Sequence, residues 1–212
     1  ITALVVAYTL TGGLKAVIRT DVFQGVIALG LLWLGLAIVV NDSGGLSSAM
    51  ATISSSEDTA GLLSRTGNYT LLIWASTMIL WLFADPMFPQ LYQRLCAAES
   101  DESIGRMATF YPTVAWLAFL PPILIGTIGH IYHPGLDRSG GDNILPTLIL
   151  EVGGEWFGGL VLVAGLAALM STMDSQLLAT GSLVTRDLLT SISDNKWGRE
   201  LVIISLSILG LM

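Results

Sequence analysis

Charged side chains are scarce in this sequence. They account for 12% of its 212 residues, whereas hydrophobic residues account for 53%. A soluble domain usually carries about a quarter charged residues, and the mean hydropathy of +0.73 is that of a lipid-embedded chain. The composition therefore excludes a soluble enzyme and predicts an integral membrane protein.

Cysteine and positive charge are also in short supply. The single cysteine, Cys96, can form no intramolecular disulfide, and no CxxC or Cys/His spacing suggests a metal site. Nine Lys and Arg stand against 16 Asp and Glu, a balance that excludes a nucleic-acid partner held by net charge. With no nucleophile–base arrangement in the sequence, we expect neither an enzyme nor an organic cofactor.

Apolar runs of membrane-spanning length occur several times along the chain. A spanning helix needs about 20 predominantly apolar residues. We predict complete spans over residues 22–41, 69–93, 107–130 and 156–188, with partial spans over residues 1–10 and 200–212. The predicted fold class is all-α integral membrane, with the whole chain in one transmembrane domain. Both ends lie inside apolar runs and the first residue is not Met, so we expect an internal fragment of a longer protein.

Basic residues are distributed unevenly among the predicted connections. Seven of the nine lie in alternate connections, namely Lys15, Arg19, Arg94, Arg106, Arg186, Lys196 and Arg199. Because an excess of Lys and Arg marks the cytoplasmic side, these connections are predicted to face the cytoplasm of a multi-pass plasma membrane protein. We interpret Arg94 as a topological charge or a gate residue rather than as a ligand.

One predicted span is interrupted by prolines and a carboxylate. The stretch "WLFADPMFPQLYQRL" places Asp85, Pro86 and Pro89 inside the span over residues 69–93. Each proline removes a backbone donor and clashes with the preceding turn. Discontinuous helices of this kind carry the substrate site in many secondary transporters, and intramembrane carboxylates are usually functional. The alternative is a proline-kinked packing helix whose aspartate is paired with a neighbour.

A second predicted span carries a polar face. In "AALMSTMDSQLL", helical periodicity puts Ser171, Thr172, Asp174 and Ser175 on one arc together with Ala168. Two overlapping groups of oxygens result: the Ala168 carbonyl with the Ser171 and Thr172 hydroxyls, and Ser171 with Asp174 and Ser175. Neutral oxygens with at most one carboxylate suit Na⁺ better than a divalent ion. The alternative is that these hydroxyls join packed membrane helices, which leaves the cost of Asp174 in lipid unexplained.

Two long motifs give the sequence a family resemblance. The stretches "AALMSTMDSQLLATGSLVTRDL" and "YTLTGGLKAVIRTDVFQGVI", supported by "QRLCAAES" and "DNILPTLI", strongly resemble the sodium:solute symporter family. That family includes proline and pantothenate permeases and sodium/glucose cotransporters. The resemblance implies part of a leucine-transporter-like five-plus-five inverted-repeat helix bundle, from the end of core helix 4 to the start of core helix 9.

The resemblance also implies roles for the polar residues. Ala168, through its carbonyl, Ser171 and Thr172 match the principal sodium site of the family; we call them the first oxygen set. Asp21, Asp174 and Ser175, near the shared Ser171, match the second sodium site of some members; we call them the second oxygen set. Asp174 replaces a hydroxyl residue there. The sequence therefore leaves open whether the protein couples to one sodium ion, to two sodium ions or to a proton.

The broken span implies a solute site by the same resemblance. Trp81 and Pro89 fall where proline permeases have substrate-site residues, whereas Asp85 replaces an aromatic residue. Met87 and Phe88 replace a glycine and a glutamine, which argues against proline as the solute. Our hypothesis is that Asp85 meets an amine or hydroxyls of the solute.

The sequence therefore predicts a sodium-driven symporter working by alternating access. Its predicted partners are Na⁺, a small organic solute of the amino acid, sugar or carboxylate class, and the lipid bilayer. One alternative is the same membrane domain serving as a sensor fused to a histidine kinase. A channel or a purely structural bundle is the other alternative, and the broken span and the polar face both argue against it.

Overall fold

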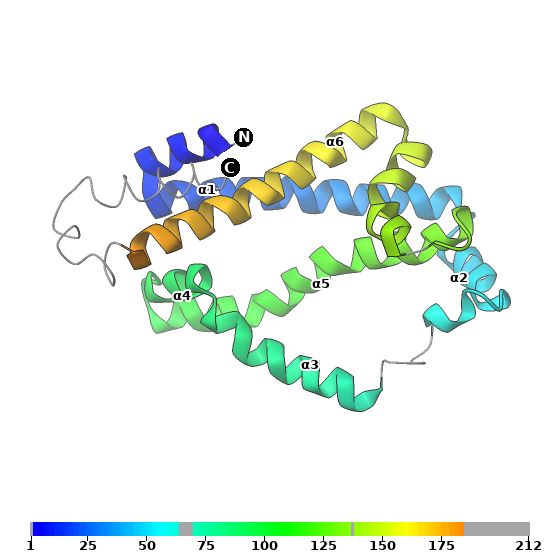
Figure 1. Cartoon of the computed structure of the whole chain (residues 1–212), viewed down its shortest axis with the longest axis horizontal. Helices are drawn as coiled ribbons and strands as arrows, with labels where there is room; N and C mark the ends of the chain where they lie inside the picture. Colours follow the sequence, from blue (N-terminus) through cyan, green and yellow to red (C-terminus); the bar gives the residue numbers. More distant parts are fainter. Residues whose placement is uncertain (1, 64–69, 137, 185–212) are drawn as a thin grey trace. The chain divides into compact units, whose positions relative to one another are not determined.

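The computed structural model describes residues 2–63, 70–136 and 138–184, and every regular element in these ranges is a helix (Figure 1). The helices are α1 (Thr2–Asp42), α2 (Leu46–Ser55), η1 (Ala60–Leu63), α3 (Leu71–Ala84), η2 (Asp85–Met87), α4 (Pro89–Cys96), α5 (Asp101–Tyr132) and α6 (Arg138–Leu183). The all-α prediction is confirmed over these residues. The predicted partial span over residues 200–212 and the end of the span over residues 156–188 lie outside them.

Among the described residues, three helices are long and apolar enough to cross a membrane. They are Leu14–Asp42, Asp101–Tyr132 and Gly140–Leu183. A fourth crossing is formed if α3 with η2 and α4 are one span bent by 61°. The predicted spans over residues 22–41 and 107–130 lie within Leu14–Asp42 and Asp101–Tyr132, and the predicted span over residues 69–93 overlaps the bent pair.

Two segments expected to connect spans are helical instead. Residues 11–21 belong to α1, and the part of α1 long and apolar enough to cross a membrane begins at Leu14, directly after Gly12 and Gly13. Leu46–Ser55 forms the short helix α2, which buries Ala49 and Ile53. Short amphipathic helices of this kind carry too little hydropathy to stand out as spans.

A glycine divides α6 in two. Gly154 has φ 78° and ψ 169°, which is not helical. Only glycine reaches this region without a Cβ clash. The predicted start of the last complete span at Trp156 therefore coincides with a real break in the helix.

The chain forms two compact units. One comprises residues 27–80 and 105–165 and holds the apolar core, which consists of Leu36, Val39, Ala49, Ile125, Ile128, Leu148, Ile149 and Val161. Gly129 lets α5 approach α6 closely, since a Cβ there would overlap the side chain of Ile144.

Within this unit, α1 and α5 are joined at a proline. In a regular helix the Leu117 carbonyl would accept the N–H of residue 121, but Pro121 has none. The indole Nε1 of Trp33 donates to that carbonyl at 2.9 Å. A partner from another helix thus replaces the hydrogen bond that the proline removes.

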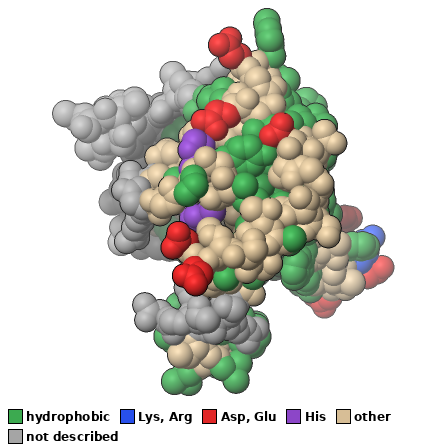
Figure 2. Space-filling view, turned by 90° about the vertical axis from the view of Figure 1, so that its right-hand side faces the viewer, with side chains coloured by type: hydrophobic (Ala, Val, Ile, Leu, Met, Phe, Trp, Pro, Cys, Tyr) green, Lys and Arg blue, Asp and Glu red, His purple; other side chains and the backbone are tan. Residues whose placement is uncertain are grey.

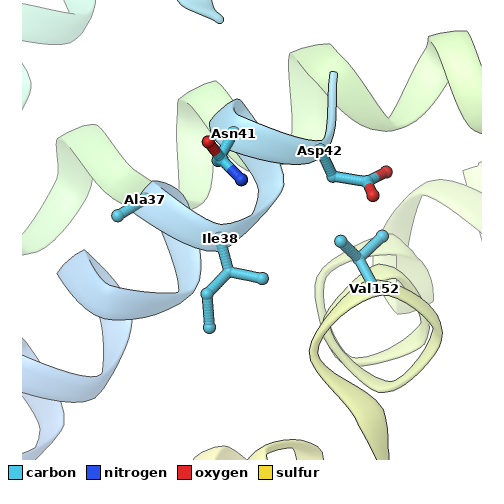
Figure 3. A pocket seen from close by; sticks show the side chains of 5 residues that line it. All are labelled: Ala37, Ile38, Asn41, Asp42 and Val152. Carbon is cyan, nitrogen blue, oxygen red and sulfur yellow. The ribbon is translucent and has the colours of Figure 1, made fainter. Parts of the chain in front are cut away.

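The same unit has a polar end. The Tyr132 hydroxyl donates to Asp42 at 2.6 Å, and His133 Nε2 lies 2.9 Å from a Glu151 oxygen. Asp42 also borders an open hollow lined by Ala37, Ile38, Asn41 and Val152 (Figure 3). Figure 2 shows acidic side chains and histidines among hydrophobic and uncharged groups, with a basic group at the edge of the view.

Candidate functional site

All nine predicted site residues belong to the other compact unit, which comprises Ile1–Val26, Trp81–Ile104 and Leu166–Met212. They come from three elements far apart in sequence: the part of α1 before residue 27, the break between α3 and α4, and the second half of α6. None of them lines the hollow of Figure 3, which belongs to the first unit.

The first oxygen set lies on consecutive turns of α6. The Thr172 hydroxyl donates to the Ala168 carbonyl at 3.2 Å, and Ser171 is half-buried beside them. Thr172 and Ala168 are exposed. The Thr172 oxygen keeps its own lone pairs while it donates its proton to the carbonyl, and both residues are exposed on the helix surface, where a monovalent cation could reach these oxygens.

The polar residues one turn further along α6 are buried. Asp174 is 0% exposed and Ser175 is 8% exposed. The Ser175 hydroxyl lies 2.9 Å from the Ser171 carbonyl and 3.3 Å from an Asp174 carboxylate oxygen. Because a hydroxyl has one proton, it donates to one of these acceptors at a time.

Arg94 connects the second oxygen set to α4. Its guanidinium forms an ion pair with Asp21 on α1 and donates to the Ser175 hydroxyl on α6 at 2.6 Å. The neighbouring Gln93 donates to the Ala179 carbonyl of α6 at 3.5 Å. The structure thus brings together Asp21, Ser175 and Asp174 as a group, with an arginine at its centre.

Sequence reasoning did not include Arg94 among the ligands. The arginine is 73 positions from Asp21 and 81 from Ser175, and helical periodicity reports only neighbours along one helix. The sequence contains one signal, namely Asp21 near a predicted inner interface. A carboxylate at such a position requires a cationic partner.

The predicted break in the α3–α4 span is present. Helix α3 ends at Ala84, a 3₁₀ turn covers Asp85–Met87, and Phe88 adopts an extended conformation (φ −64°, ψ 123°). Pro89 then opens α4, where its missing N–H costs nothing because the first helical donors have no intrahelical acceptor. The carbonyl of Phe88 accepts the first N–H groups of α4.

The three predicted solute residues lie at this break. Trp81 is 53% exposed, Asp85 is half-buried and Pro89 is exposed. Among the described residues, no hydrogen bond or ion pair joins them to the first oxygen set. They share its compact unit and remain a separate group on α3, η2 and α4.

Known proteins resemble the whole chain. Residues 1–212 match the sodium:solute symporter family. The sodium/pantothenate symporter of Haemophilus influenzae is 29% identical over 87% of this chain and 38% of its own length. The high-affinity proline transporter PutP of Bacillus subtilis is 31% identical over 91% and 40%. The human sodium/iodide cotransporter is 25% identical over 93% and 33%.

The chain thus spans about two fifths or less of the length of these relatives. No solved structure matches it. The match to the family covers every residue of the chain, including the broken helix and the polar helix. The chain belongs to the sodium:solute symporter family.

Proposed function

We propose that the full-length protein is a multi-pass plasma membrane symporter that moves a small organic solute with Na⁺ by alternating access. The proposal includes a five-plus-five inverted-repeat fold, of which this chain forms the central part. The observation that carries it is the shared oxygen patch of Ala168 and Thr172 on α6, in the same compact unit as the broken helix.

In this mechanism Na⁺ binds to the first oxygen set. The Ala168 carbonyl and the hydroxyls of Ser171 and Thr172 supply part of its ligand shell, and the remaining ligands come from parts of the full-length protein outside this chain. The ion stabilises the position of α6 in which the solute site beside the α3–α4 break is complete. Coupling is then a difference in solute affinity between the sodium-bound and sodium-free states, and it is reciprocal.

The solute binds at the break, beside Trp81, Asp85 and Pro89. The aspartate supplies a negative charge where the chain leaves the α3 helix, and it favours a solute that carries an amine or hydroxyl donors. The relatives' names include proline, pantothenate and iodide, so the family alone leaves the solute class open.

The test is radiolabelled uptake by the full-length protein in vesicles, with and without a sodium gradient. Amino acids, sugars and monocarboxylates, with proline and pantothenate among them, form the panel. The variant is Thr172→Val, which removes one oxygen at nearly constant shape. Thr109→Val is the matched control, because the Thr109 hydroxyl makes the same bond, to the Gly105 carbonyl at 2.9 Å, on the exposed surface of α5.

We expect sodium to drive uptake in the wild type and in Thr109→Val. In Thr172→Val we expect the sodium dependence of uptake to be weakened at least tenfold. The loss of one hydrogen-bonding or ligand contact to a charged group costs about 1.5–3 kcal/mol, which corresponds to a weakening of binding by roughly tenfold or more. Equal sodium dependence in all three proteins would rule out the first oxygen set as the ion site.

A further inference from the structure

A cation already lies within the second oxygen set. The Arg94 guanidinium contacts both Asp21 on α1 and Ser175 on α6. The Asp21 side chain is only 11% exposed, and that of Arg94 is 33% exposed. The guanidinium therefore occupies the position in which a free monovalent ion would contact these oxygens.

The arginine fits this position incompletely. Among the described residues, three buried polar atoms have no hydrogen-bond partner: Oδ1 of Asp21, Oε1 of Gln24 and Nε of Arg94 itself. Buried polar groups that lack a hydrogen-bond partner destabilise the arrangement that contains them. Asp21 and Gln24 are three residues apart on α1, so their oxygens lie on one face of the helix.

A planar guanidinium and a compact ion differ in which of the unpaired oxygens they can contact. A guanidinium bonds only in its own plane, along fixed N–H directions. A compact monovalent cation has no such restriction and accepts several oxygen ligands around it. The face of α1 that the arginine leaves unsatisfied is thus better matched to a small ion.

We propose that Arg94 and a monovalent cation compete for Asp21 and Ser175, so that binding of the cation breaks the contacts of Arg94 with α1 and α6. The inference rests on the proposed sodium coupling and adds a second step to it. Arg94 is a positioning residue in this account. While it is paired, Arg94 helps to hold α4, the half-helix that follows the break; once it is displaced, the bond from Gln93 to the Ala179 carbonyl remains and α4 is held less firmly.

The first experiment measures the reactivity of Arg94 in the wild-type, full-length protein in detergent. Phenylglyoxal modifies accessible, unpaired guanidinium groups, and mass spectrometry locates the products. Sodium chloride is compared with choline chloride at equal ionic strength. Arg106 is the internal control, because its side chain is exposed and forms no ion pair or hydrogen bond with the residues that the structure describes.

Sodium is expected to raise the modification rate of Arg94 at least about fivefold, the lower end for coupled sites, and to leave Arg106 unchanged. In Asp21→Asn the rate is high in both salts. An Arg94 rate that sodium leaves unchanged or lowers overturns the proposal, and it does so without any variant that must fold.

The second experiment measures binding of ²²Na⁺ to purified full-length protein. Arg94→Gln removes the competitor, and Arg94→Lys keeps a tethered cation as the matched control. The half-saturating sodium concentration is expected to fall at least about fivefold in Arg94→Gln and to stay near the wild-type value in Arg94→Lys. Equal or weaker binding in Arg94→Gln overturns the competition.

Failure of this inference is separable from failure of the proposed function. If Thr172→Val abolishes sodium-driven uptake while sodium leaves Arg94 unaffected, only the competition is wrong. If Thr172→Val leaves uptake unchanged while sodium still exposes Arg94, the first oxygen set is wrong and the competition stands.

Discussion

Replacing Trp33 by Phe tests how the structure compensates for Pro121. The substitution removes the Nε1 donor that satisfies the Leu117 carbonyl at 2.9 Å and keeps an aromatic ring. Trp33 is 37% exposed, so its packing contributes less than that of a core residue. The main effect is the loss of one hydrogen bond to a carbonyl without its helical partner.

The magnitude follows from the setting of this bond. A net hydrogen bond is worth about 0.5–1.5 kcal/mol, and bonds between membrane helices average about 0.6 kcal/mol. Because the Leu117 carbonyl lies within a helix apolar enough to cross a membrane, little water is available there to replace Trp33. We therefore expect the free energy of unfolding to fall by about 1 kcal/mol in Trp33→Phe.

Pro121→Ala provides the matched background. Alanine restores the N–H at position 121, which can donate to the Leu117 carbonyl within α5. In that background, Trp33→Phe should cost at least about 0.5 kcal/mol less, a coupling within the range for residues in contact. The assay is unfolding of the full-length protein in mixed micelles with increasing SDS. The same cost of Trp33→Phe in both backgrounds would refute the reasoning.

Three further substitutions test other parts of the structure. Gly129→Ala should destabilise the protein by about 1–3 kcal/mol, the usual cost of overpacking, because the new Cβ would overlap the side chain of Ile144. Gly105→Ala on the same helix is the control: a Cβ there has no atom within 4 Å, so this substitution should be neutral or stabilising in the same SDS titration. Gly154→Ala should cost about 1–3 kcal/mol from backbone strain alone, and a cost below 0.5 kcal/mol, roughly that of an ordinary surface change, would contradict the strained break. Asp85→Asn should weaken the apparent solute affinity in uptake assays about tenfold or more, the value of a charged hydrogen bond, while sodium dependence persists; unchanged affinity would remove Asp85 from the solute site.

The sequence predicted the features that depend on neighbours along the chain. The all-helical class followed from composition, the break from Pro86 and Pro89, and the polar face from the 3.6-residue period around Ser171 and Thr172. The Thr172 bond to the Ala168 carbonyl is the local contact that this period implies.

Features that depend on distant parts of the chain were not predictable. Arg94 contacts residues of two other helices, and its place near a predicted cytoplasmic loop gave no indication of the partners. The link from Trp33 to the Leu117 carbonyl is of the same kind. Residues 11–21, where two glycines and three charged residues suggested a loop, have helical backbone as well.

The most direct test of the central claim is the reciprocity of binding in the purified, full-length protein. The affinity for the solute identified by the uptake screen is measured with and without Na⁺, and the affinity for ²²Na⁺ is measured with and without that solute. Sodium coupling at the first oxygen set predicts that each ligand raises the affinity for the other by the same factor. It predicts that the shared factor drops toward one in Thr172→Val. A solute affinity that is independent of sodium in the wild-type protein would contradict the account.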